Sequence, residues 1–289
     1  MKTKIGIIGH GFVGKAVANS FAGRTDVKVR IHDPAYPEIS KSLDKIKEKS
    51  EVIFVCVPTN QAEDGTCDTS ILETVLEQLV GYEGIVISKS TAPPLLYRQL
   101  ENTLGLKLLH APEFLTAANA NHDYISPVNV VIGGKHKLWE EATQYIAPYI
   151  NFSPANFEYC SIAEAAMFKY VANTMLAMKV IMNNEYANLC ERLNINWENV
   201  ASIAEGDQRL GYSHWRVPGP DGKKGFGGAC FPKDTMALDC FATEAGIEMK
   251  MLQTAIEKNY SLRTDLSKPN KTEKSKVKPS NVKLEPTST

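Results

Sequence analysis

Short apolar runs alternate with amphipathic stretches through the first half of the chain. Runs rich in Val, Ile and Leu predict strands at 4–8, 27–31, 52–57, 84–90, 106–111 and 129–134. Stretches between them, such as 70–80, have the spacing of helices. This alternation is typical of a doubly wound parallel sheet with helices on both faces, and we expect an α/β domain over residues 1–150.

The pattern changes in the second half of the chain. The stretch 161–193 contains neither Gly nor Pro and is mostly apolar, which predicts one long helix buried on several sides, by its own domain or by a partner chain. A short helix is expected over 197–205, an irregular loop over 206–228, and one or two helices between 235 and 266. We therefore expect an all-helical central domain over 155–265, followed by a disordered Lys-rich tail at 266–289.

Composition narrows the class of protein. Hydrophobic residues make up 43% of the chain, charged residues 22%, and the net charge is −1, so bulk electrostatics indicate neither nucleic acid nor a membrane surface. No apolar run has transmembrane length, and the first residues lead directly into a strand without a signal-peptide pattern. The six cysteines lack metal-ligand spacing, which predicts free thiols in a reducing cytoplasm and no metal site.

A glycine-rich turn follows the first predicted strand. Gly9, Gly11 and Gly14 form GxGxxG between that strand and a helix, with Phe12 and Val13 inside the motif. Such a loop places a pyrophosphate at the helix N-terminus, the Rossmann-type arrangement. Asp33 lies 19 residues after Gly14, at the end of the second strand, where a carboxylate accepts from a ribose 2′-hydroxyl. These residues predict NAD as the cofactor rather than NADP.

Polar residues also follow three later strands. Because ligands bind at the carboxyl ends of such strands, we expect these loops to point toward one crevice. Taken singly, residues of this kind are more often turn residues than site residues. The first two loops supply further candidate cofactor contacts, namely Val57, Pro58, Thr59, Ser90 and Thr91; the third is Ala111–Phe114.

Two polar residues interrupt the long apolar helix. Lys169 and Asn173 lie one turn apart and therefore on one face. A buried lysine is costly unless it is paired or functional, which favours a polar site. The alternative is a lysine that reaches solvent and an amide satisfied within the core.

The segment Gly225–Asp234 reads GFGGACFPKD and sets Cys230 among glycines. Glycines allow a backbone to approach a ligand closely, and a thiol beside Lys233 and Asp234 has the composition of a nucleophilic site. The alternative is a small buried cysteine beside a glycine turn, with the lysine and the aspartate as a surface pair.

These three segments occur in an order that resembles the UDP-glucose 6-dehydrogenase, or nucleotide-sugar dehydrogenase, family over residues 1 to about 265. APEFL at 111–115 and NNE at 183–185 resemble that family too. The resemblance implies an oxidoreductase of polysaccharide biosynthesis that converts a nucleotide-sugar C6 alcohol to the uronate with NAD, UDP-glucose to UDP-glucuronate first among them. It also implies a homodimer formed through the long helix.

The resemblance further implies roles for individual residues. Cys230 would carry a thiohemiacetal and then a thioester, Lys169 and Asn173 would stabilise charge on the C6 oxygen, and Glu113 would act as general base for hydrolysis. Asp234 would orient water or Lys169, and Thr59 would help hold the water. Residues expected to contact the substrate are Phe114, Leu115, Lys169, Asn173, Arg209, Phe226, Gly227 and Gly228.

The chain departs from the family pattern in two respects. Ala117 stands where the family usually has a second glutamate, and the Lys-rich tail stands where a third, nucleotide-gripping domain usually follows, so we expect a truncated form. Two other functions therefore stay open. One is a non-catalytic NAD-binding subunit or scaffold that pairs with a full-length homologue, and the other is a two-electron β-hydroxyacid dehydrogenase.

Overall fold

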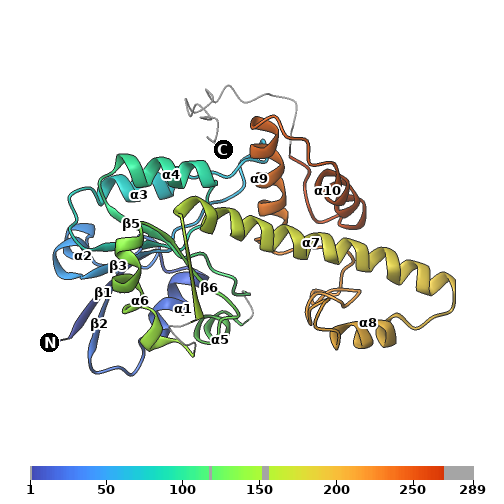
Figure 1. Ribbon diagram of the computed structural model, residues 1–289, viewed down its shortest axis with the longest axis horizontal. Helices are drawn as coiled ribbons and strands as arrows, with labels where there is room; N and C mark the ends of the chain where they lie inside the picture. Colours follow the sequence, from blue (N-terminus) through green and yellow to red (C-terminus); the bar gives the residue numbers. More distant parts are fainter. Residues whose placement is uncertain (1, 117–118, 152–155, 270–289) are drawn as a thin grey trace. The chain divides into compact units, whose positions relative to one another are not determined.

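The computed structural model describes residues 2–116, 119–151 and 156–269, arranged in two compact units (Figure 1). Unit 1 comprises Met1–Asn60 and Asp68–Lys169, and unit 2 comprises Gln61–Cys67 and Tyr170–Thr289. Ala117 and nearly all of the predicted Lys-rich tail, from residue 270 onward, lie outside the described residues.

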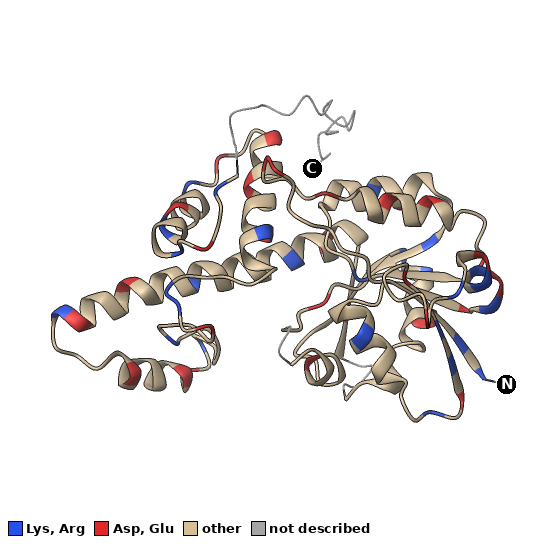
Figure 2. Cartoon of the chain, turned by 180° about the vertical axis from the view of Figure 1, so that it is seen from behind, with Lys and Arg blue, Asp and Glu red and all other residues tan. Residues whose placement is uncertain are grey.

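Charged residues of both signs occur in both units. Figure 2 colours the Lys and Arg positions blue and the Asp and Glu positions red, and both colours occur on the helices of each unit. Within the described residues, no helix is long and apolar enough to cross a membrane.

Unit 1 is built on one seven-stranded sheet in the order β2-β1-β3-β4-β5-β6-β7. Its strands are β1 Thr3–Ile8, β2 Val27–His32, β3 Val52–Val55, β4 Ile85–Ser88, β5 Lys107–His110, β6 Val130–Gly134 and β7 Phe157–Cys160. Neighbouring strands are parallel except β5 and β6, which pair antiparallel. The strand order reverses direction at β1, which pairs with both β2 and β3, and the glycine loop follows β1 at that switch point.

Helices cover both faces of the sheet (Figure 1). One layer contains α1 Phe12–Ser20, α5 Ala120–Ile125 and α6 Trp139–Thr143, and the other contains α2 Leu43–Lys49, α3 Ser70–Gln78 and α4 Pro94–Thr103. Short 3₁₀ turns occupy His136–Leu138 and Ala147–Tyr149. Strands β3 and β4 are buried at every position, as expected for a sheet covered on both sides.

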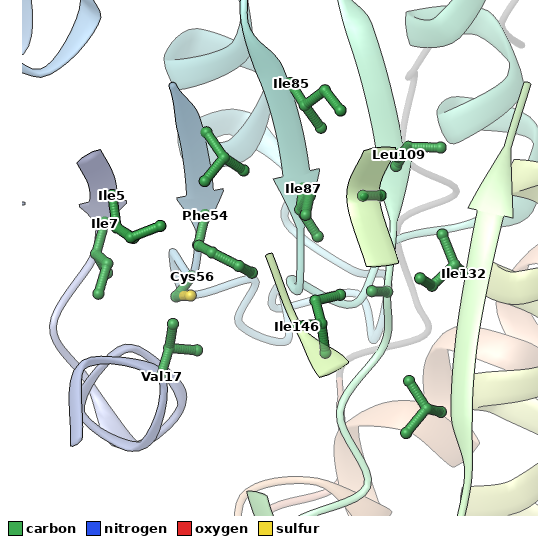
Figure 3. Packing of buried hydrophobic residues seen from close by; sticks show 14 of the residues in the cluster. Ile5, Ile7, Val17, Phe54, Cys56, Ile85, Ile87, Leu109, Ile132 and Ile146 are labelled. Carbon is green, nitrogen blue, oxygen red and sulfur yellow. The ribbon is translucent and has the colours of Figure 1, made fainter. Parts of the chain in front are cut away.

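Figure 3 shows how the sheet meets the α1 layer. Ile5 and Ile7 of β1, Phe54 of β3 and Val17 of α1 belong to one core on this face of the sheet, and all four are fully buried. Because alternate strand residues face opposite sides, Ile8, Ile53 and Val55 belong to the core on the other face.

The doubly wound α/β fold and all six predicted strands are confirmed, with shorter bounds for several strands. β7 was not predicted from the sequence, because FEYC is a four-residue run containing a charge, and only its pairing with β6 makes it a strand. The antiparallel pairing of β6 was also not predicted, since strand direction depends on the path of the connection rather than on apolar pattern.

The long helix α7 spans Ile162–Arg192 and passes from unit 1 into unit 2 after Lys169. Unit 2 continues with α8 Trp197–Glu205, α9 Phe231–Glu244 and α10 Lys250–Leu262. Its cores are small and separate. Tyr170 packs with residues of α9 and α10, while Trp197 and Trp215 pack together beside α8. The predicted long helix and the irregular loop before Cys230 are both present.

Candidate active site

The glycine loop after β1 has the geometry of a dinucleotide site. Gly9 has φ +89°, and a Cβ there would lie 2.4 Å from the Cys56 carbonyl oxygen. A Cβ on Gly14 would lie 1.9 Å from the Gly9 oxygen, so this glycine lets α1 pack against the loop. Gly11, the N-cap of α1, faces open space instead. The residues therefore fit a pyrophosphate, which would meet the free N–H groups of the first helical turn at Phe12 and Val13.

The carboxylate of Asp33 is fixed at the end of β2. One oxygen accepts the His10 N–H at 2.6 Å and the other accepts the Ala35 N–H at 2.8 Å. Since a carboxylate has about four acceptor sites, it keeps capacity for ribose hydroxyls. The His10 Nδ1 atom is buried without a hydrogen-bond partner among the described residues, which leaves one more polar atom of this loop for a ligand or water.

Hydrogen bonds join the loops that follow β3 and β4. The buried Ser90 hydroxyl donates to the Val57 carbonyl at 2.7 Å, and the Tyr97 hydroxyl donates to the Ser90 carbonyl at 2.6 Å. Thr59 is also buried in the loop after β3, whereas Pro58 is exposed. The structure thus brings the predicted Val57 and Ser90 together.

A buried lysine ties the third loop to the loop after β4. Lys89, which follows β4, donates to the Ala111 carbonyl at 3.1 Å and forms an ion pair with Glu113. The Lys89 side chain is 5% exposed and that of Glu113 is 14% exposed, so this pair is largely removed from water. The sequence analysis did not select Lys89, although a lysine that directly follows a fully buried strand, in the run ISKS, is a signal for a paired charge.

Lys169 contacts the same loop within unit 1. Its ammonium donates to the Glu113 backbone carbonyl and lies 5.0 Å from the centre of the Phe114 ring. Phe114 also packs edge-on against Phe168, and Leu115 packs on the core of the sheet. Lys169 is only 7% exposed, so it does not reach solvent in the way that the alternative interpretation requires.

In unit 2, Cys230 is exposed and precedes the first residue of α9 as its N-cap. The helix begins at Phe231, earlier than the sequence predicted, so Asp234 lies in its first turn and its N–H donates to the Cys230 carbonyl at 2.8 Å. The exposed thiol contradicts the alternative of a small buried cysteine.

The Asp234 carboxylate is 1% exposed, and each of its oxygens accepts a hydrogen bond within unit 2. Asn173 donates to one oxygen at 2.5 Å and Lys233 to the other at 2.6 Å. Lys233 and Asp234 are therefore not a surface pair, and Asn173 is held by a carboxylate rather than by the backbone of its own helix. This network fixes the Asn173 amide within unit 2.

The other predicted substrate contacts of unit 2 lie in two settings. The Arg209 side chain is 88% exposed and pairs with Asp207 two residues before it. Phe226 is buried in the core with Ala177 and Ile181, so only its backbone lies along the loop, beside Gly227 and Gly228.

Comparisons with known proteins assign both halves of the chain to domains of one family. Residues 37–150 match the NAD binding domain of the UDP-glucose/GDP-mannose dehydrogenase family, and residues 163–261 match its central domain. The first match assigns NAD as the cofactor, which the glycine loop and Asp33 fit. UDP-glucose 6-dehydrogenase of Rickettsia bellii is 30% identical over 73% of this chain, and the chain spans about half the length of that protein, 50%.

Solved structures show the same fold. A UDP-glucose dehydrogenase from Pyrobaculum islandicum has a TM-score of 0.76 and 24% identity, covering 90% of this chain and 68% of its own. A 3-hydroxyisobutyrate dehydrogenase from Mycobacterium tuberculosis has a TM-score of 0.73 and 19% identity, covering 92% of this chain and 95% of its own. The two family-model matches together span most of the described residues, and the chain belongs to the UDP-glucose/GDP-mannose dehydrogenase family.

Proposed function

We propose that this protein catalyses the NAD-dependent, four-electron oxidation of a nucleotide-sugar C6 alcohol to the uronate, with UDP-glucose as the first substrate to test. The observation that carries the proposal is the exposed Cys230 thiol at the start of α9, one turn before Asp234, which Asn173 and Lys233 hold. A two-electron dehydrogenase does not need a thiol at this position, whereas a four-electron dehydrogenase needs one to capture the aldehyde intermediate.

The proposed chemistry balances in four steps. The C6 alcohol loses two electrons and two protons, as a hydride and a hydroxyl proton, to give the aldehyde. The Cys230 sulfur then adds to the aldehyde carbon and its proton passes to the oxygen, giving a thiohemiacetal. A second loss of a hydride and a hydroxyl proton gives the thioester, and water cleaves the carbon–sulfur bond to release the carboxylate, a proton and the thiol. NAD, when bound, accepts the hydride in each of the two oxidations.

The proposal gives each candidate side chain a role in this reaction. We assign Lys169 and Asn173 to the C6 oxygen, where a cation and an amide donor stabilise developing negative charge. Glu113 is assigned as general base for the hydrolytic water and Thr59 as a further partner of that water. Lys89 holds the Glu113 carboxylate by its ion pair and thereby keeps the base in one orientation. Asp234 positions Asn173.

Three further parts of the proposal concern the setting of the protein. We propose a homodimer through α7, because Val171, Met175 and Met182 on this helix are exposed apolar side chains. We place the protein in the cytoplasm, because none of the six cysteines, all of them among the described residues, forms a disulfide. The substrate partner is a nucleotide sugar.

The test measures NADH formed per substrate consumed, with purified protein, NAD and either UDP-glucose or GDP-mannose, beside the Cys230→Ala variant. Two NADH per sugar, with the second lost in the variant, is the expected result. One NADH per substrate in both proteins would favour a two-electron β-hydroxyacid dehydrogenase. Intact NAD binding without turnover on either sugar, and turnover only when a longer homologue is added, would favour a non-catalytic subunit.

A further inference from the structure

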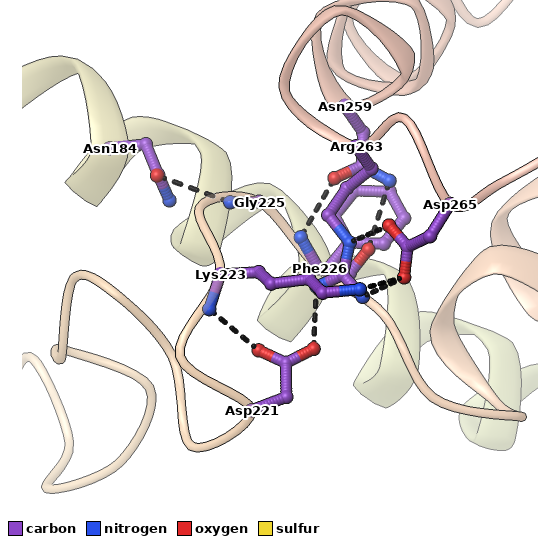
Figure 4. Close-up of polar contacts among 8 residues, drawn as sticks. All are labelled: Asn184, Asp221, Lys223, Gly225, Phe226, Asn259, Arg263 and Asp265. Atoms are coloured by element: carbon purple, nitrogen blue, oxygen red, sulfur yellow. Dashed lines mark hydrogen bonds and ion pairs between the residues drawn. The ribbon is translucent and has the colours of Figure 1, made fainter.

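The loop before Cys230 is paired to α10 through one buried amide. The Asn259 Oδ1 atom accepts the Phe226 N–H at 2.7 Å, and its Nδ2 donates to the Phe226 carbonyl at 3.0 Å (Figure 4). Asn259 is 2% exposed, so both bonds form away from water. Since a single amide satisfies both backbone groups of one residue, it fixes the loop as a neighbouring strand would.

A second amide holds the loop from α7. The Asn184 Oδ1 atom accepts the Gly225 N–H at 3.1 Å, and its Nδ2 donates to the Val180 carbonyl of its own helix at 2.8 Å. Two consecutive N–H groups of the loop are therefore bound by side chains from two helices of unit 2.

A buried arginine makes an ion pair with the preceding part of the loop. Arg263, just after α10, is 4% exposed, and it pairs with Asp221 at 2.7 Å and with Asp265 at 2.9 Å (Figure 4). Lys223 also reaches Asp265, at 2.8 Å. The segment 221–223 is thus tied to the end of α10 by ion pairs that are partly shielded from solvent.

We call the contacts that Asn259 and Arg263 make with the loop the clamp. Two glycines of the loop lie so close to these two side chains that a larger residue would not fit. A Cβ on Gly225 would lie 2.5 Å from the Asn259 Oδ1 atom, and a Cβ on Gly227 would lie 2.3 Å from the Arg263 Nη2 atom. Gly228, with φ +75°, has no heavy atom within 4 Å of its would-be Cβ. Gly225 and Gly227 therefore leave room for the Asn259 and Arg263 side chains, and Gly228 faces open space close to Cys230 in the sequence.

We propose that Asn259 and Arg263 are positioning residues that fix Gly225–Gly228 and, through them, the point at which Cys230 begins α9. The proposal rests on the function proposed above for Cys230. Glycine-rich backbone has more conformational freedom than any other, so without the clamp the thiol would sample many positions. A displacement of about 1 Å at a reacting atom costs on the order of a hundredfold in rate.

The test compares Asn259→Asp with Thr254→Ala, an exposed change on the same helix. Asn259→Asp keeps an acceptor for the Phe226 N–H but removes the donor to its carbonyl. Hydrogen exchange of the Gly225–Gly228 amides should become at least about tenfold faster, as expected for one lost buried hydrogen bond. A trifluoromethyl label on Cys230, assigned by its absence in Cys230→Ser, should give a broadened or shifted fluorine signal. Thr254→Ala should change neither.

The activity readout separates positioning from stability. In Asn259→Asp, kcat should fall at least about tenfold while the NAD dissociation constant stays within about twofold, since unit 1 is unchanged. Arg263→Met provides a second variant if Asn259→Asp fails to fold, and Arg263→Lys should recover part of the loss.

Faster exchange with an unchanged fluorine signal and unchanged kcat would overturn the proposal, because the clamp would then be structural only. Unchanged exchange in both Asn259→Asp and Arg263→Met would overturn it as well. If the unmodified protein shows no turnover, the proposed function fails, while the exchange and fluorine measurements still decide whether Asn259 and Arg263 position Cys230.

Discussion

The two glycine-rich loops of this protein differ in what packs against their glycines. In unit 1, Gly9 and Gly14 make room for the backbone of their own unit, while Gly11 faces open space at the start of α1. In unit 2, Gly225 and Gly227 make room for side chains of the α10 region, while Gly228 faces open space just before α9. Each loop thus has closely packed glycines and one open glycine beside a helix N-terminus.

The contrast between the two loops shows how a glycine in a sequence motif should be interpreted. It signals that something approaches the backbone closely, but not whether that is a ligand, the chain itself or a side chain. Backbone neighbours cannot move without moving a strand, whereas Asn259 and Arg263 can change rotamer. We therefore expect unit 1 to tolerate substitutions in its packed glycines less well than unit 2 does.

The largest expected effect comes from Gly9→Ala. The positive φ costs about 1–2 kcal/mol for a non-glycine residue, and the contact with the Cys56 backbone adds a similar or larger strain. We expect a loss of about 4 kcal/mol of unfolding free energy in urea. Gly225→Ala, which has a similar φ of +77° but meets a side chain, should lose about half as much. Equal losses would contradict the distinction between the loops.

The next largest effect is expected for Gly227→Ala in unit 2, and a second substitution should relieve it. Gly227→Ala places a methyl group against the Arg263 guanidinium, so the arginine must leave its partners Asp221 and Asp265. We expect a loss of about 2 kcal/mol. In a double-mutant cycle, Arg263→Ala should remove most of the extra cost of the methyl group, giving a coupling energy of about 1 kcal/mol or more. Additive losses would show that the clash lies elsewhere.

The open glycine of unit 1 should affect binding instead of stability. Gly11→Ala meets no atom within 4 Å, so the unfolding free energy should change by less than about 1 kcal/mol. The added methyl group would occupy the space expected for the pyrophosphate, and the NAD dissociation constant should rise at least about tenfold by isothermal titration calorimetry. Unchanged NAD affinity would place the cofactor away from this loop.

Acid should give the smallest effect, a reversible loosening of the unit 2 loop. Hydrogen bonds from Arg263 and Lys223 lower the pKa of Asp265 below that of a free carboxyl group. A lowered pKa means that the ion pair stabilises the fold above the usual carboxyl pKa and that this contribution is lost as the pH falls below it. Exchange at Gly225–Gly228, corrected for its intrinsic pH dependence, should therefore accelerate below about pH 4, and Asp265→Asn should show that faster exchange already at neutral pH.

Much of the fold followed from local pattern. The spacing of apolar residues predicts the strands from β1 to β6 and the helix α7. The glycine loop and Asp33 form a local motif that is recognised from its spacing relative to these strands. The cofactor was predicted for the same reason. β7 was missed because a four-residue strand becomes one only by pairing with β6.

The parts of the site that depend on distant side chains were harder to predict. The role of Lys89 depends on Glu113, which lies 24 residues away in the sequence, and the clamp depends on Asn259, 33 residues after Phe226. Neither pair has a sequence spacing that a periodic pattern could reveal. Asn173 and Asp234 were each selected, but their hydrogen bond joins residues 61 apart, so only the structure shows that they form one network.

The most direct test of the central claim is to trap the acyl group on Cys230. Glu113→Gln should slow thioester hydrolysis, because the amide cannot act as a base. Mass spectrometry of this variant after incubation with NAD and UDP-glucose should show a covalent sugar nucleotide adduct on the peptide that contains Cys230, together with two NADH per adduct. Formation of NADH with an unmodified Cys230 peptide, or an adduct on another residue, would contradict the account.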